Sequence, residues 1–125
     1  KRIAESRLPD GWQVFKINGP LFFAAADRIF GELAVLARNA RGFILYMDGV
    51  TILDAGGLSA LNKLIATCER DGTQIVIADL QFQPLRTLAR AGVAPIAGVS
   101  RYTSSLDEAL RLISCPASET DRASG

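Results

Sequence analysis

Two short apolar runs constrain the fold of this chain more than any other feature. Residues 43–47 read Phe-Ile-Leu-Tyr-Met, and residues 74–78 read Gln-Ile-Val-Ile-Ala. Alternate side chains of a strand point to opposite faces, so a run that is apolar at nearly every position has no face suited to water. Strands buried on both faces are typical of parallel sheets covered by helices. The sequence therefore predicts an α/β fold with a mostly parallel central β-sheet.

Amphipathic segments alternate with these runs and predict about four helices packed on the sheet. The first two are expected at residues 21–38 and 56–70. A short helix begins near Pro84, where proline suits the first helical position, and a last one follows the capping box of Ser105 and Glu108. In the first helix, the residues at buried spacing are Phe22, Ala26, Ile29, Phe30, Leu33 and Ala37.

Three further segments have weaker strand character. Residues 3–8 and 12–17 flank the turn sequence Pro9-Asp10-Gly11 and are expected to form a hairpin. Residues 50–53 are a short apolar stretch, and residues 96–102 read as a weak edge strand.

The composition narrows the function. The chain has 125 residues, which suits one domain, and it has no histidine, so neither a Ser-His-Asp nor a Cys-His nucleophile system is available. Its formal charge of +1 gives no basic face for nucleic acid. The two cysteines lie far apart, and no apolar run reaches the roughly 18 residues of a membrane span. We expect a non-enzymatic soluble domain without metal or cofactor.

The segment at residues 51–58 is the first candidate site. It joins the end of a strand to the start of a helix, which is where ligands and partners usually bind in open α/β sheets. Asp54 is suited to cap that helix, and Gly56 and Gly57 permit close approach of the backbone or of a partner. A cap combined with tight internal packing remains the alternative. The phosphate-binding patterns G-x-x-x-x-G-K-[ST] and G-x-G-x-x-G are absent.

The second candidate is the pair Arg86 and Arg90. Their i, i+4 spacing places both on one face of the short helix. They form either a solvated face or a small basic patch for an acidic partner.

Four segments of the chain resemble the STAS domain, the fold shared by anti-sigma-factor antagonists and the cytoplasmic tails of SulP-type anion transporters. The likeness covers residues 11–114, and its carriers are residues 17–26 (INGPLFFAAA), 52–58 (ILDAGGL), 82–92 (FQPLRTLARAG) and 105–110 (SLDEAL). The run that starts at Gly19 is similar to the transporter branch, especially to bacterial permeases of the C4-dicarboxylate and sulfate type.

One departure from the family pattern bears on function. In the antagonists, an Asp-Ser pair precedes the glycine region, and a kinase phosphorylates that serine. Here Asp54 matches the aspartate but Ala55 stands at the serine position, so the phospho-switch cannot operate there. The departure agrees with the transporter branch.

The resemblance implies a regulatory and protein-interaction domain of a sulfate, bicarbonate or dicarboxylate transporter, at the cytoplasmic face of the bacterial inner membrane. The implied partners are the transmembrane domain of the same transporter, an acidic cytosolic protein and a second copy in a homodimer. The residues expected to bind a partner are Asp54, Ala55, Gly56, Gly57, Leu58, Arg86 and Arg90. A stand-alone anti-sigma-factor antagonist and a weak nucleotide-binding module remain alternatives.

The expected division of the chain follows from the same likeness. Residues 1–10 would form a juxtamembrane segment and the first edge strand, residues 11–115 the STAS domain and residues 116–125 a disordered tail. The sequence opens at Lys1 and its single methionine is Met47, so we expect it to be part of a longer protein.

Overall fold

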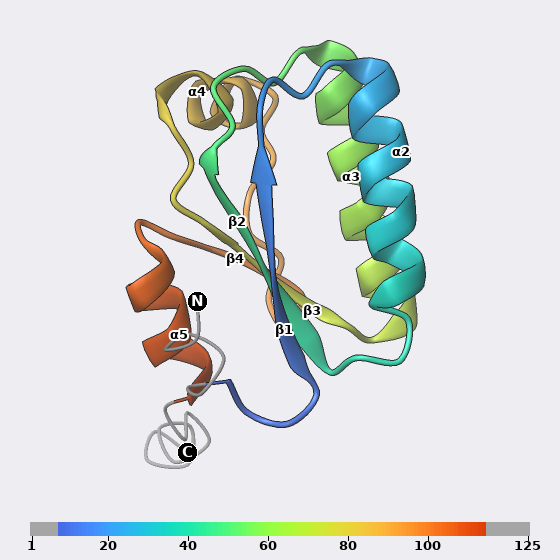
Figure 1. The fold of residues 1–125 in the computed structure, drawn as a ribbon, viewed down its shortest axis with the longest axis vertical. Coiled ribbons are helices and arrows are strands. Elements are labelled where there is room, and N and C mark those ends of the chain that lie inside the picture. Colours follow the sequence, from blue (N-terminus) through green and yellow to red (C-terminus); the bar gives the residue numbers. More distant parts are fainter. Residues whose placement is uncertain (1–7, 115–125) are drawn as a thin grey trace.

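A computed structural model describes residues 8–114 and shows four parallel strands with four helices (Figure 1). The strand order is β1-β2-β3-β4, and each neighbouring pair is parallel. This confirms the predicted α/β class and the four-helix expectation. The elements in chain order are β1 (Trp12–Asn18), α2 (Phe23–Leu36), β2 (Gly42–Gly49), α3 (Ala55–Asp71), β3 (Gln74–Ala78), α4 (Phe82–Arg90), β4 (Ser100–Thr103) and α5 (Leu106–Ser114).

The sheet separates two cores of unequal size. Helices α2 and α3 cover one face, α5 packs on the other, and α4 lies at the end of the sheet where β1 and β2 terminate (Figure 1). In β2, Phe43 and Leu45 enter the core under α2 and α3, whereas Ile44 enters the core under α5. All three are fully buried. The apolar run at residues 43–47 is thus explained by a strand with helices on both of its faces.

The weaker strand predictions need correction. Most of the segment at residues 3–8 lies outside the described residues, so the predicted hairpin stays untested, and β1 pairs in parallel with β2. Residues 50–53 form no strand, because only Leu53 pairs, in an isolated bridge with Leu21. The strand predicted at residues 96–102 shortens to β4, and Ile96 makes an isolated antiparallel bridge to Ser100.

Two helix starts also differ from expectation. Helix α2 begins at Phe23, because Leu21 is drawn into its bridge and Phe22 takes an extended N-cap conformation. Phe22 is therefore 50% exposed and does not belong to the buried stripe. Helix α4 begins two residues before Pro84, which fits in the first turn because the backbone N–H groups there have no partner within the helix.

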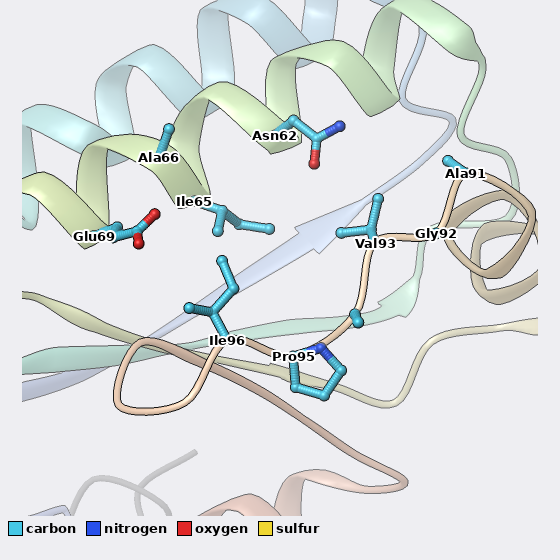
Figure 2. A pocket seen from close by; sticks show the side chains of 10 residues that line it. Asn62, Ile65, Ala66, Glu69, Ala91, Gly92, Val93, Pro95 and Ile96 are labelled. Atoms are coloured by element: carbon cyan, nitrogen blue, oxygen red, sulfur yellow. The ribbon is translucent and has the colours of Figure 1, made fainter.

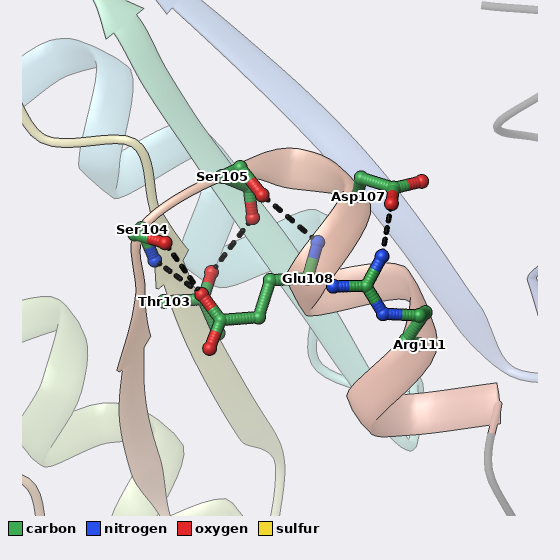
Figure 3. A network of polar contacts seen from close by, with 6 residues as sticks. All are labelled: Thr103, Ser104, Ser105, Asp107, Glu108 and Arg111. Atoms are coloured by element: carbon green, nitrogen blue, oxygen red, sulfur yellow. Dashed lines mark hydrogen bonds and ion pairs between the residues drawn. The ribbon is translucent and has the colours of Figure 1, made fainter.

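The start of α5 confirms the predicted capping box, except that Glu108 bonds to Ser104 rather than to Ser105. Ser105 Oγ accepts a hydrogen bond from the Glu108 N–H at 3.0 Å. The Glu108 carboxylate reaches one residue further back than the box requires, accepting from both the N–H and the hydroxyl of Ser104 at 2.7 Å (Figure 3). These bonds hold the pKa of Glu108 below its ordinary value.

Candidate functional site

Three segments meet beyond the carboxyl ends of β1 and β2, and Leu53 lies between them. On one side, the Leu21 carbonyl accepts from the Asp54 N–H at 3.4 Å and the Leu21 N–H donates to the Ile52 carbonyl at 2.8 Å. On the other side, the Leu53 N–H donates to Gln83 Oε1 at 2.8 Å and the Leu53 carbonyl accepts from Gln83 Nε2 at 3.3 Å. The Gln83 side chain thus pairs with Leu53 as a neighbouring strand would, and it ties α4 to the start of α3.

Asp54 is the N-cap of α3, as predicted. Its backbone is extended, and its carboxylate accepts a hydrogen bond from the Gly57 N–H at 2.6 Å. This bond satisfies one of the N–H groups that a helix start leaves without a partner. Ala55 is the first residue of α3, is exposed and carries no hydroxyl. Its match to the phosphorylated serine of the antagonists stays a prediction.

Gly56 and Gly57 allow close contacts within the chain. A Cβ at Gly57 would lie 2.3 Å from the Leu21 carbonyl oxygen and 2.8 Å from Leu53 Cδ1. A Cβ at Gly56 would lie 2.4 Å from Phe23 Cβ. The two glycines therefore bring the start of α3 against the loop before α2. This agrees with the packing alternative, and their direct contact with a partner stays a prediction.

The sequence analysis missed the most exposed apolar surface of this end. Five large apolar side chains stand here at exposed fractions of 40–73%, and we call them the apolar platform: Phe22, Phe23, Ile52, Phe82 and Leu85. They come from the three segments that Leu53 joins. One signal was available, because consecutive residues on a helix diverge by about 100° and two adjacent phenylalanines cannot both join one buried stripe. Exposed apolar side chains on segments that meet at one end of a domain are typical of interaction sites.

One of the two predicted arginines contacts this platform. Arg86 lies with its guanidinium carbon 5.7 Å from the centre of the Phe82 ring, in a cation–π contact. Arg90 is exposed in the last turn of α4. Within residues 8–114, the structure records an ion pair for neither arginine. Through Gln83, the structure brings the helix of Arg86 and Arg90 to the same end of the sheet as Asp54.

The ionisable groups nearby are engaged in structural contacts. Asp48, at the end of β2, accepts hydrogen bonds from Lys16 and from the Tyr46 hydroxyl. The bond from Lys16 holds the pKa of Asp48 below its ordinary value and raises that of Lys16. Over the described part of the chain, no three His, Cys, Asp or Glu side chains form a group that could hold a metal ion.

The family model of the STAS domain matches residues 4–109. The chain is a STAS domain of the sulfate transporter family. A sulfate transporter family protein from Wolinella succinogenes is 33% identical, with a TM-score of 0.72 over 85% of this chain and 87% of that one.

Two further proteins are similar to this chain. The SulP transporter STAS domain from Vibrio cholerae shares the fold at 22% identity, with a TM-score of 0.67 over 94% of this chain and 88% of that one. The probable sulfate transporter 4.2 of Arabidopsis thaliana is 26% identical over 90% of this chain. This STAS domain spans only 18% of that transporter's length.

The predicted family and fold are thus confirmed. The likeness to dicarboxylate permeases stays a prediction, since these relatives are named as sulfate transporters. None of the helices in residues 8–114 has the length and apolar character needed to cross a membrane.

Proposed function

We propose that this STAS domain is the non-enzymatic cytoplasmic regulatory domain of a bacterial anion transporter and that its apolar platform docks a cytosolic protein. The platform carries the proposal, because five large apolar side chains in contact with water at one end of a small domain are unfavourable unless a partner covers them. The Gln83–Leu53 pairing supports it by fixing α4 and the two loops as one surface before any partner arrives.

The charges select the class of partner. Arg86 contacts the platform, Arg90 follows one turn later on the same helix, and neither has an ion pair among the described residues. A partner with carboxylates around an apolar centre therefore complements this surface. β1 runs from the opposite end of the domain toward the platform (Figure 1). A transmembrane domain joined ahead of β1 therefore leaves the platform facing the cytosol. That transmembrane domain would bind and transport the anion, and sulfate, bicarbonate and dicarboxylates are the candidates.

The alternatives find less support in the geometry. Phosphate binding at the start of α3 is opposed by the Asp54 carboxylate, which already occupies the Gly57 N–H and would repel a nucleotide. The kinase-regulated antagonist is opposed by Ala55, which offers no hydroxyl at the switch position.

A capture experiment tests the docking proposal. The wild-type domain, Arg86→Glu, Phe82→Ser and the control Val35→Ser are immobilised, and a recovered protein is identified, purified and titrated against each. Val35 is 62% exposed and comes from the far end of α2, so it matches Phe82 in exposure without belonging to the platform. We expect binding by wild type and Val35→Ser, and at least tenfold weaker binding by the other two. Equal binding by all four contradicts the platform.

The place in a transporter has a separate test. Reading the complete coding sequence should reveal hydrophobic spans ahead of this domain. A start codon directly before Lys1 with no such spans would refute the transporter assignment and leave the platform result standing.

A further inference from the structure

A groove away from the platform lies between α3 and the segment that follows α4 (Figure 2). Its volume is about 470 Å³, within the range of small-molecule sites. Ile65, which is 5% exposed, forms the floor from α3, and Ile96 points toward it from the opposite wall (Figure 2). Val93 and Pro95 extend that wall. The centre of the groove is therefore apolar.

Hydrogen bonds hold the wall opposite α3 in place. The Tyr102 hydroxyl donates to the Val93 carbonyl at 2.9 Å, and the Ile96 N–H donates to Ser100 Oγ at 2.9 Å. Ser100 belongs to β4 and is 2% exposed, so this wall is fastened to the sheet. The groove is thus preformed, which lowers the conformational cost of filling it.

Two polar side chains stand at opposite ends of the groove. Asn62 and Glu69 are seven residues apart on α3, a rise of about 10 Å along the helix axis, and both line the groove. Figure 2 shows the amide of Asn62 and the carboxylate of Glu69 on either side of the apolar floor. Glu69 is the single charged residue among those that line the groove. Neither side chain has a hydrogen bond or ion pair within residues 8–114.

These features define the chemistry of the occupant. Glu69 is a carboxylate with no lysine or arginine among the residues that line the groove, and it therefore disfavours anions such as those that the family's transporters carry. A cation is favoured at Glu69, an apolar body over Ile65 and Ile96, and a hydrogen-bonding group at Asn62.

We infer that this groove binds a small primary amine whose ammonium group is separated by a compact apolar body from a hydroxyl or amide. The ammonium pairs with Glu69, the body covers Ile65 and Ile96, and the far polar group bonds Asn62. This site is independent of the proposed docking function.

Tyramine is a suitable probe. The matched control is 3-(4-hydroxyphenyl)propionate, which has a carboxylate in place of the ammonium group. Each compound is titrated into the isotope-labelled domain, and the backbone amide chemical shifts are followed by NMR. For tyramine we expect saturable shifts in the millimolar range, centred on Ile65, Glu69, Val93 and Ile96, and for the propionate none. Equal shifts with both compounds, or none with either, overturn the inference. Nα-acetyl-lysinamide is a third arm, and binding as tight as that of tyramine overturns the assignment to a small amine and indicates a protein lysine instead.

Two variants test the roles of the lining residues. Glu69→Gln should weaken tyramine binding about threefold to fivefold, the change expected of an exposed ion pair. Ala66→Phe, at an exposed α3 position of the groove, should obstruct the apolar floor and abolish the shifts. Glu32→Gln, an exposed position on α2, is the charge-matched control and should bind as wild type does. Wild-type affinity in Glu69→Gln with a folded spectrum contradicts the assigned ammonium position.

Discussion

Gly57→Ala is the sharpest test of how this STAS domain positions its candidate site. The added methyl group would lie 2.3 Å from the Leu21 carbonyl oxygen and 2.8 Å from Leu53 Cδ1. Real Cβ atoms do not approach other atoms so closely, and the carbonyl belongs to a backbone fixed by the Leu21–Leu53 bridge. The start of α3 must therefore move away from the loop before α2, which disturbs the Asp54 cap as well.

The magnitude follows from two opposing terms. Overpacking by one methyl group against a rigid neighbour costs about 3 kcal/mol. Alanine in a helix regains about 1 kcal/mol over glycine. We expect a net loss of about 2 kcal/mol in the free energy of unfolding, a large share of the roughly 5–15 kcal/mol typical of a domain.

Gly31→Ala is the matched control. Gly31 also lies inside a helix, and a Cβ there would meet nothing within 4 Å. Because the added methyl group meets no neighbour, the higher helix propensity of alanine should stabilise the domain by about 0.5–1 kcal/mol. The two glycine substitutions are thus expected to change stability in opposite directions.

Urea unfolding followed by the fluorescence of Trp12, the single and buried tryptophan, measures both changes. At a slope of about 2 kcal/mol per M of urea, the midpoint should fall by about 1 M for Gly57→Ala and rise by about 0.25–0.5 M for Gly31→Ala. If Gly57→Ala unfolds at or above the wild-type midpoint with an unchanged slope, the close packing argued for the start of α3 is wrong.

Three further predictions concern the caps and the pairing at Leu53. Asp54→Ala should destabilise the domain by about 1 kcal/mol in urea unfolding, whereas Asp54→Asn, which keeps the capping oxygen, should lose less; equal losses would contradict the cap. Gln83→Met leaves the backbone N–H of Leu53 without its partner and should cost about 1–3 kcal/mol, with faster hydrogen exchange at Leu53; unchanged exchange would contradict the pairing. The pKa of Glu108 is lowered because Ser104 donates hydrogen bonds to its carboxylate. The stability that this ionised carboxylate contributes is therefore fully present above pH 4.5, the ordinary pKa, and is lost as the pH falls through the lower pKa of the folded state. Glu108→Gln should therefore lower stability at neutral pH but not in strong acid, and a pH-independent difference would refute this.

The local signals in the sequence identified much of the fold because each depends on near neighbours. The runs at residues 43–47 and 74–78 require burial on both faces wherever the helices lie, and the structure has them in β2 and β3. The pairing of Ser105 with Glu108 is complete within one helical turn, and so is the cap of Asp54 on Gly57. The motifs around these elements also sufficed to indicate the STAS family.

The composition of the candidate site depends on contacts between segments that are far apart in the chain. Leu21 lies 32 residues before Leu53, and Gln83 lies 30 residues after it. No periodicity reports contacts at such separations, so the sequence placed Phe22 in a buried stripe whereas the fold exposes it. The close approach of Gly57 to the Leu21 carbonyl and the groove between Asn62 and Pro95 have the same origin. The local patterns predicted the two central strands, the four helices and the caps at Asp54 and Ser105, because each of these depends on residues close in the chain. The packing of distant segments decided which side chains were left for a partner or a ligand.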